Sequence, residues 1–212
     1  MSNLPEYSKN TLMVYLDLKP LDIEICDVTL RDGEQTPGVA FNKKEKVAIA
    51  LELDSVGVEI IEVGFPVVSS AEKAIVKEVA GMGLDARTCC LARSVIGDVD
   101  AAIDCGVDFV SIFIAMSDLH LRYKYHKSCE EMAECAFSTI EYAKDHGLGV
   151  RFAAEDATRT SIDTLKKAFL MAEDYKVDYV SIADTIGILN PSTPSYLVSE
   201  RKKVVITPTY RH

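Results

Sequence analysis

The 212-residue chain contains no tryptophan, and no apolar run in it reaches the roughly 18 residues that a membrane-spanning helix needs. The opening segment "MSNLPEYSKN" lacks the apolar core of a secretory signal. Basic residues are also scarce, since 23 Lys and Arg face 33 Asp and Glu, which gives a net charge of −10. This balance disfavours a nucleic-acid partner or an anionic membrane surface. We therefore expect a cytoplasmic protein without nucleic-acid or membrane partners.

No two cysteines are spaced as C-x-x-C, although the chain has six of them. Cys89 and Cys90 are adjacent, and several of the others lie in apolar runs typical of strands. A disulfide framework is thereby disfavoured. We expect all six to be reduced and to pack as small apolar side chains. The cysteines are Cys26, Cys89, Cys90, Cys105, Cys129 and Cys135.

What the chain does have is a regular alternation of β-rich runs with segments of helical period. In residues 43–56, Val47, Ala48, Ala50, Leu51 and Leu53 are predicted to form one apolar face. A capping residue precedes a glutamate by three positions in "NKKE" (42–45), "SSAE" (69–72) and "SCEE" (128–131), which predicts three helix starts. Gly57 and Gly147 are expected just past helix ends. The β-rich runs are 21–30, 59–66, 85–92, 108–116, 148–155, 178–184 and 203–210.

The repeated units resemble one another, as "GVEIIEV" (57–63), "GVDFVSI" (106–112) and "KVDYVSI" (176–182) show. Alternating strands and helices predict a parallel sheet, and continuously apolar strands predict that both of its faces are covered. The pattern favours a (β/α)₈ TIM barrel of which about strands 1–7 are present, preceded by an extension over 1–20 and filling 21–212. A doubly wound open sheet is the alternative, but no G-x-G-x-x-G follows any strand.

Ionisable side chains follow six of the seven predicted strands, where the catalytic groups of such barrels gather. An acidic rim that also carries arginines and histidines suits a divalent metal and an anionic substrate. Each group taken alone could instead be a helix cap or a solvated ion pair. His126 and His146 follow no strand, and we expect them on the surface. The groups at the strand ends are Arg31, Asp32, Glu34, Arg93, His120, Glu155, Asp156, Arg159, Asp184 and His212.

Five ordered motifs carry a family resemblance: "DVTLRDGEQTPG" (27–38), "IEVGFPVVS" (61–69), "SDLHL" (117–121), "AAEDATRT" (153–160) and "ADTIGILNP" (183–191). From about residue 21 onward the chain resembles the acetyl-CoA-dependent Claisen-condensing synthases, which include 2-isopropylmalate, homocitrate and citramalate synthases. The resemblance implies a metal-dependent TIM-barrel enzyme, homodimeric in its full-length relatives. Such an enzyme joins acetyl-CoA to a 2-oxo acid and then hydrolyses the thioester.

The resemblance also implies residue roles. Asp32 would bind the divalent cation (Mg, Mn or Zn), and Arg31 would steady the developing negative oxygen. Glu155 would be a catalytic carboxylate, and His120 would point toward the substrate. Thr185 would contact the carboxylate of the 2-oxo acid.

Two further residues are expected at the substrate from their places after predicted strands. Gln35 belongs to the loop that also carries Arg31 and Asp32, and Arg93 ends the third predicted strand. We expect both to contact substrate.

The chain departs from the family pattern at its last residue. His212 corresponds to the first histidine of an H-x-H metal motif, and the second histidine and an eighth strand do not follow. We expect a fragment that is poorly active alone, with Asp32 and His212 as its metal ligands. Activity would then require a complementing C-terminal piece.

Arg151 bears on the choice of substrate, because it shares a strand face with Ala153 and Glu155. A pocket-facing arginine would pair with the distal carboxylate of 2-oxoglutarate, which favours a homocitrate synthase. The stretches "EQTPGVAF" (34–41) and "DLHLRYKY" (118–125) resemble archaeal homocitrate synthases, which implies a role in coenzyme B synthesis. The alternative for Arg151 is an ion pair with a neighbouring acid. A 2-isopropylmalate or citramalate synthase, an enzyme like 3-hydroxy-3-methylglutaryl-CoA lyase and a non-catalytic fragment stay open as alternatives.

Overall fold

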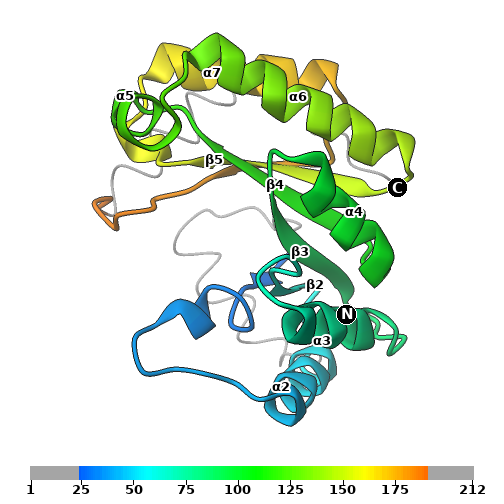
Figure 1. Ribbon diagram of the computed structural model, residues 1–212. Coiled ribbons are helices and arrows are strands. Elements are labelled where there is room, and N and C mark those ends of the chain that lie inside the picture. The colour runs from blue at the N-terminus through cyan, green and yellow to red at the C-terminus, as the bar shows by residue number, and fades with distance from the viewer. Residues whose placement is uncertain (1–23, 191–212) are drawn as a thin grey trace, which may run out of the picture.

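The computed structural model describes residues 24–190, which form a half-barrel of six parallel strands in the order β1-β2-β3-β4-β5-β6. Figure 1 shows the long helices on the outer side of the curved sheet. The extension at 1–20, the run at 203–210 and His212 lie outside the described residues. The strands are β1 Cys26–Asp27, β2 Ile60–Gly64, β3 Arg87–Arg93, β4 Phe109–Ala115, β5 Gly149–Glu155 and β6 Tyr179–Ile182. The helices are α2 Lys43–Ser55, α3 Ser70–Ala80, α4 Ile96–Cys105, α5 Asp118–His120, α6 Cys129–Asp145 and α7 Ile162–Asp174, with short turns η1 Gly33–Gln35, η2 Leu121–Tyr125 and η3 Ala157–Arg159.

The first strand is much shorter than the predicted run of 21–30, of which residues 24–30 are described. Asp27 ends it, because its carboxylate accepts hydrogen bonds from Thr29 N at 2.8 Å and Thr29 Oγ1 at 3.2 Å. The carbonyl of Val28 then accepts from three successive backbone N–H groups, those of Arg31, Asp32 and Gly33. An Asx-type turn followed by a nest of N–H groups stops strand pairing and starts the polar loop.

The three predicted helix starts are confirmed. Asn42 with Glu45 and Ser128 with Glu131 form reciprocal capping boxes at α2 and α6. Ser69 caps α3 by accepting from Glu72 N, but the Glu72 carboxylate makes other contacts, described below.

The predicted glycine positions at the helix ends are also confirmed. Gly57 and Gly147 follow α2 and α6 with φ of 85° and 80°, a left-handed backbone that favours glycine.

The predicted apolar face of α2 is wrong in part. Ala48 and Leu51 are exposed, whereas the buried residues of the helix are Lys46 and Ala50. The face turned to the sheet therefore contains a lysine, whose charge requires partners inside the protein.

The acid in each of the three similar units has a shared structural role. Glu59 accepts from Ile25 N at 2.8 Å, Asp108 accepts from Thr88 N at 2.6 Å, and Asp178 accepts from Val150 N at 2.7 Å. In each case the acid comes directly before its own strand. Its carboxylate accepts from a backbone N–H at or near the start of the strand that precedes it in the sheet. The repeat in the sequence therefore encodes a bond that fixes the register of neighbouring parallel strands.

The apolar core lies between the sheet and the helices, and a smaller cluster fills the inside of the curve. That inner cluster consists of Ile60, Cys89 and Phe109, with Cys26 and Tyr179 packed against it. Residues alternate along each strand between the helix side and the inner side. Among the described residues no helix is long and apolar enough to cross a membrane.

All six cysteines are free. Cys89, Cys90 and Cys105 are buried as predicted, whereas Cys26, Cys129 and Cys135 are half-buried. The prediction that all six pack as buried apolar side chains is therefore wrong for the last three. Cys26 has polar partners inside the half-barrel.

Candidate active site

A buried carboxylate joins two arginines on the inner side of the half-barrel. Glu62, on β2, has no exposed surface, and one of its oxygens accepts from Arg31 Nε while the other accepts from Arg151 Nη2. Arg31 comes from the loop after β1 and Arg151 from β5, and their side chains are 19% and 15% exposed. Two guanidinium groups thus share one buried carboxylate.

A thiol completes the surroundings of Arg151. Its Nη1 lies 3.1 Å from Cys26 Sγ, and its Nε donates to Ser111 Oγ at 3.0 Å. A hydrogen bond from the Cys89 thiol and the positive charge of Arg151 lower the pKa of Cys26 to about 6, against the opposing effect of burial. Burial raises the pKa of the Cys89 thiol well above its ordinary value. Cys26 is therefore the more acidic of the two thiols.

The predicted metal ligand Asp32 lies at the mouth of this cluster. Its side chain is 59% exposed and accepts from Arg31 Nη1 at 2.7 Å. Within residues 24–190 no group of three or more His, Cys, Asp or Glu side chains is arranged to hold a metal ion. This part of the chain therefore supplies Asp32 alone of the predicted set, since His212 lies beyond it.

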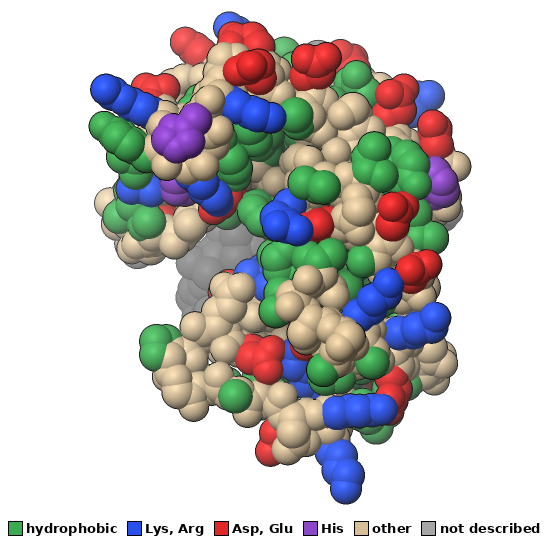
Figure 2. Space-filling model, viewed as in Figure 1, with side chains coloured by type: hydrophobic (Ala, Val, Ile, Leu, Met, Phe, Trp, Pro, Cys, Tyr) green, Lys and Arg blue, Asp and Glu red, His purple; other side chains and the backbone are tan. Residues whose placement is uncertain are grey.

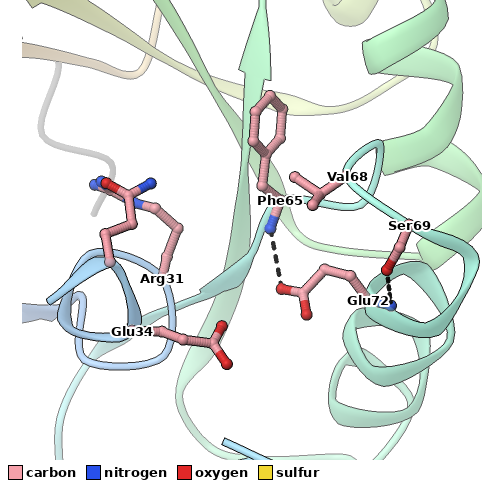
Figure 3. A pocket seen from close by; sticks show the side chains of 7 residues that line it. Arg31, Glu34, Phe65, Val68, Ser69 and Glu72 are labelled. Carbon is pink, nitrogen blue, oxygen red and sulfur yellow. Dashed lines mark hydrogen bonds between the residues drawn. The ribbon is translucent and has the colours of Figure 1, made fainter. Parts of the chain in front are cut away.

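A pocket of about 230 Å³ opens between the first loop and the segment that joins β2 to α3. Figure 3 shows the carboxylates of Glu34 and Glu72 directed toward each other across it. The predicted substrate residue Gln35 lines this pocket and is exposed. The lining residues are Arg31, Glu34, Gln35, Phe65, Val68, Ser69 and Glu72.

Lys46 holds the two facing carboxylates in place. Its ammonium lies 2.7 Å from Glu34 Oε2 and 2.9 Å from both Glu72 oxygens, and its side chain is 1% exposed. The Glu72 carboxylate occupies space that only glycine leaves at position 64, where a Cβ atom would collide with it. The loop that carries Arg31 is thereby anchored to α2 and α3.

The predicted catalytic carboxylate of Glu155 ends β5 and is held by the turn after β4. Lys124 Nζ lies 2.9 Å and 2.8 Å from its two oxygens, and Tyr125 OH lies 3.5 Å from one of them. Both partners belong to η2, a π-helical turn, a geometry that recurs at functional sites. Glu155 lies four residues beyond Arg151, about 13 Å further along the strand.

The next residue, Asp156, contacts two further residues with predicted roles, His120 and Thr185. Its carboxylate accepts from Ser117 Oγ and lies 3.6 Å from His120 Nδ1, while its backbone N donates to Thr185 Oγ1 at 2.8 Å. The structure therefore brings His120 and Thr185 around one acid. It does not place Arg93 with them, because the guanidinium of Arg93 is bound to both Asp98 oxygens at 2.8 Å.

The surface in Figure 2 is hollowed between the segment around α5 and the segment that precedes α2. The loops after β1 and β4, which carry Arg31, Asp32, Gln35 and His120, flank this hollow. His126 and His146 are exposed, as predicted.

Four residues that make contacts in this site were not assigned a role from the sequence. Glu62 and Lys46 each interrupt an otherwise apolar buried face, and such a charge is itself a signal of a functional or anchoring contact. Asp156 was noted only as a polar strand end. Lys124 carries no comparable signal, because lysines in polar loops are usually solvated.

The fold and the polar strand ends define an α/β-barrel protein of the type that carries its site at the carboxyl ends of the strands. The model of the family described as HMGL-like matches residues 22–212, and the chain belongs to this family. It is 66% identical over 213 aligned positions to a homocitrate synthase AksA of Methanosarcina acetivorans, covering all of this chain and 53% of the relative. It is 48% identical to a 2-isopropylmalate synthase of Methanocaldococcus jannaschii, covering 91% of this chain and 37% of the relative.

A solved structure supports the fold. The hydroxymethylglutaryl-CoA lyase of Pseudomonas aeruginosa superimposes with a TM-score of 0.73 at 22% identity, over 89% of this chain and 66% of that one. The expected incomplete TIM barrel is thereby confirmed for the described strands. The chain spans about half the length of the homocitrate synthases that it matches.

Proposed function

We propose that this chain is part of an acetyl-CoA:2-oxo acid C-acetyltransferase, and that its 2-oxo acid is 2-oxoglutarate, which gives homocitrate. The observation that carries the proposal is the pair of guanidinium groups bound to one buried carboxylate, Glu62. Guanidinium groups keep their charge and present fixed donors that match a carboxylate, so two of them on the inner side of the half-barrel support an anionic ligand.

Arg31 and Gln35 would contact the reacting end of the 2-oxo acid, and Thr185 its carboxylate. Arg151 would face the distal carboxylate of a dicarboxylate, a role supported by its place on the inner side of β5. The ion pair with Glu62 is the alternative raised for Arg151, and both roles are compatible if the ligand adds to the pair. Arg93, bound by Asp98, would need to exchange partners to reach substrate.

Condensation requires removal of a methyl proton from acetyl-CoA and stabilisation of the resulting negative oxygen. Glu155, held by Lys124 and Tyr125, and His120 are the proposed groups for proton handling. Arg31 keeps its charge and offers fixed donors to the negative oxygen. A divalent cation bound through Asp32 would act as a Lewis acid on the ketone.

The experiment measures thiol release from acetyl-CoA with a panel of 2-oxo acids and Mn²⁺ or Mg²⁺, on this chain and on one extended through an eighth strand. We expect 2-oxoglutarate to support the fastest release. If the extended chain releases no CoA with any 2-oxo acid, the synthase proposal is wrong. If only 2-oxoisovalerate supports release, the homocitrate assignment is wrong.

Variants separate the roles. Arg151→Met should weaken 2-oxoglutarate binding roughly ten- to hundredfold, the loss expected for one charged hydrogen-bonding group. Arg87→Met is the matched control, because Arg87 pairs with Glu24 at the amino end of β3. Arg31→Lys should abolish turnover with metal binding retained, whereas Asp32→Asn should weaken metal binding itself.

A further inference from the structure

Asp156 occupies an unusual position at the carboxyl end of β5. Its backbone has φ 57° and ψ 33°, and its side chain has no exposed surface. A left-handed residue other than glycine costs energy, and such residues cluster where the surrounding structure requires them. The contacts of Asp156 identify what this backbone strain maintains.

Its polar atoms bind three successive loops. One carboxylate oxygen accepts from Ser117 Oγ, after β4, and the other from Arg159 Nε at 2.7 Å, in η3. Its backbone N donates to Thr185 Oγ1, after β6. Although burial acts in the opposite direction, the hydrogen bonds from Arg159 and Ser117 hold the pKa of Asp156 below its ordinary value. The carboxylate is therefore charged at neutral pH.

His120 lies beside this carboxylate. Its Nδ1 is buried and has no hydrogen-bond partner among the described residues, and it stands 3.6 Å from Asp156 Oδ2. A nitrogen that faces a carboxylate oxygen retains its proton there, because a bare lone pair would be repelled by the negative oxygen. The imidazole remains 20% exposed.

We propose that Asp156 is a positioning residue that holds His120 in the Nδ1–H tautomer, so that the lone pair of Nε2 is the atom available to a reacting group. The distance from Nδ1 to Oδ2 shortens into a hydrogen bond when the site is occupied, as happens at sites whose contacts tighten on binding. The use of that lone pair in turnover rests on the function proposed above. The tautomer itself does not.

The alternative is that Asp156 merely braces the three loops. Asp156→Asn separates the two roles. The asparagine side chain has the same size and keeps one acceptor oxygen for the contacts between the loops, but it carries no charge. The new amide can also donate to Nδ1, which favours the opposite tautomer.

The experiment is ¹⁵N NMR of the histidine-labelled chain at a pH where the imidazoles are neutral, with His120 assigned from the spectrum of His120→Gln. We expect Nδ1–H in the unaltered chain, the reverse of the Nε2–H form that free imidazole side chains prefer in water. Asp156→Asn should convert His120 to Nε2–H. Asp118→Asn, which removes an exposed charge two residues from His120, should leave the tautomer unchanged.

An Nε2–H signal for His120 in the unaltered chain overturns the proposal and requires no variant to fold. An Nδ1–H signal that persists in a folded Asp156→Asn chain overturns it as well. Neither readout depends on turnover, so a failure of the synthase assay and a failure of this proposal are distinguishable. In an active extended chain, Asp156→Asn should lower kcat and leave KM for the 2-oxo acid unchanged.

Discussion

Glu62 has its carboxylate inside the half-barrel, where two guanidinium groups are its counter-ions. Removing one partner of a buried ion pair costs about 3–5 kcal/mol, because the remaining charge stays unpaired. We expect Glu62→Gln to lower the free energy of unfolding by about this amount in urea denaturation. Glu52→Gln, on the exposed side of α2, is the control and should change it by less than about 0.5 kcal/mol. Equal effects of the two changes would contradict the buried bridge.

Cys26 should react unusually well for a thiol. Because the thiolate is the nucleophile and the pKa is lowered to about 6, the alkylation rate with iodoacetamide should rise with pH around a midpoint near 6. Cys26→Ser identifies the reacting residue. Arg151→Met should move the midpoint upward, because it removes the positive charge beside the sulfur. A midpoint near the ordinary value of 9 would show that Arg151 and Cys89 do not stabilise the thiolate.

The places of individual site residues could be predicted in part from the sequence. Arg31 and Asp32 follow a strand in a recognisable motif, and the structure places them in the loop after β1. The partners of Arg151 could not be predicted, because Glu62 and Ser111 come from two other strands and meet it only in the folded sheet. The roles of the site residues stay predictions.

At the scale of the elements, the acids that stand before strands are open to a direct test. Asp108→Ala leaves Thr88 N and Thr88 Oγ1 without their acceptor. A buried donor without a partner costs about 1–3 kcal/mol, and we expect the free energy of unfolding to fall by that amount. Asp85→Ala, an exposed acid before β3, should have little effect. If Asp108→Ala is equally neutral, the proposed function of the repeat in setting register is wrong.

The strands and long helices were predictable because apolar runs and capping residues are local signals. β2, β3, β4 and β5 agree with their predicted runs within about two residues at each end. The length of β1 was not predictable from hydrophobicity, because a side-chain bond from Asp27 ends the strand inside an apolar run. The buried side of α2 was mispredicted for the same kind of reason. Lys46 is buried because it pairs with the carboxylates of Glu34 and Glu72, although a lysine is usually exposed.

Across the whole molecule, burial falls from the middle of the sheet toward the end of the described range. All but one of the residues of β4 are buried, whereas all four residues of β6 are half-exposed. Amide hydrogen exchange should therefore be slowest in β4 and clearly faster in β6, because local opening follows buried contacts. Exchange measured by mass spectrometry on peptides covering the two strands checks this. Equal protection of both strands would contradict it.

The parallel sheet was predictable from the alternation of strands and helices, because a helical crossover is the usual connection between parallel strands. The alternation of strands and helices does not indicate which charged side chains meet on the inner side of the half-barrel. The net charge of −10 gave no indication that arginines would gather there. Such contacts depend on side chains that are far apart in the chain, as Arg151 and Glu62 are at 89 positions.

The acids Glu59, Asp108 and Asp178 also bear on how such a barrel can be assembled. Each of these acids stands before its own strand and carries the acceptor for an N–H of the strand that precedes it, so the three bonds join β1 to β2, β3 to β4 and β5 to β6. Alignment is thus specified within three separate pairs of neighbouring strands and does not wait for ring closure. A nascent chain could set the register of each pair as its second strand emerges from the ribosome. Fragments divided between these pairs of strands would keep every such bond intact, and such a design permits modular recombination of half-barrels.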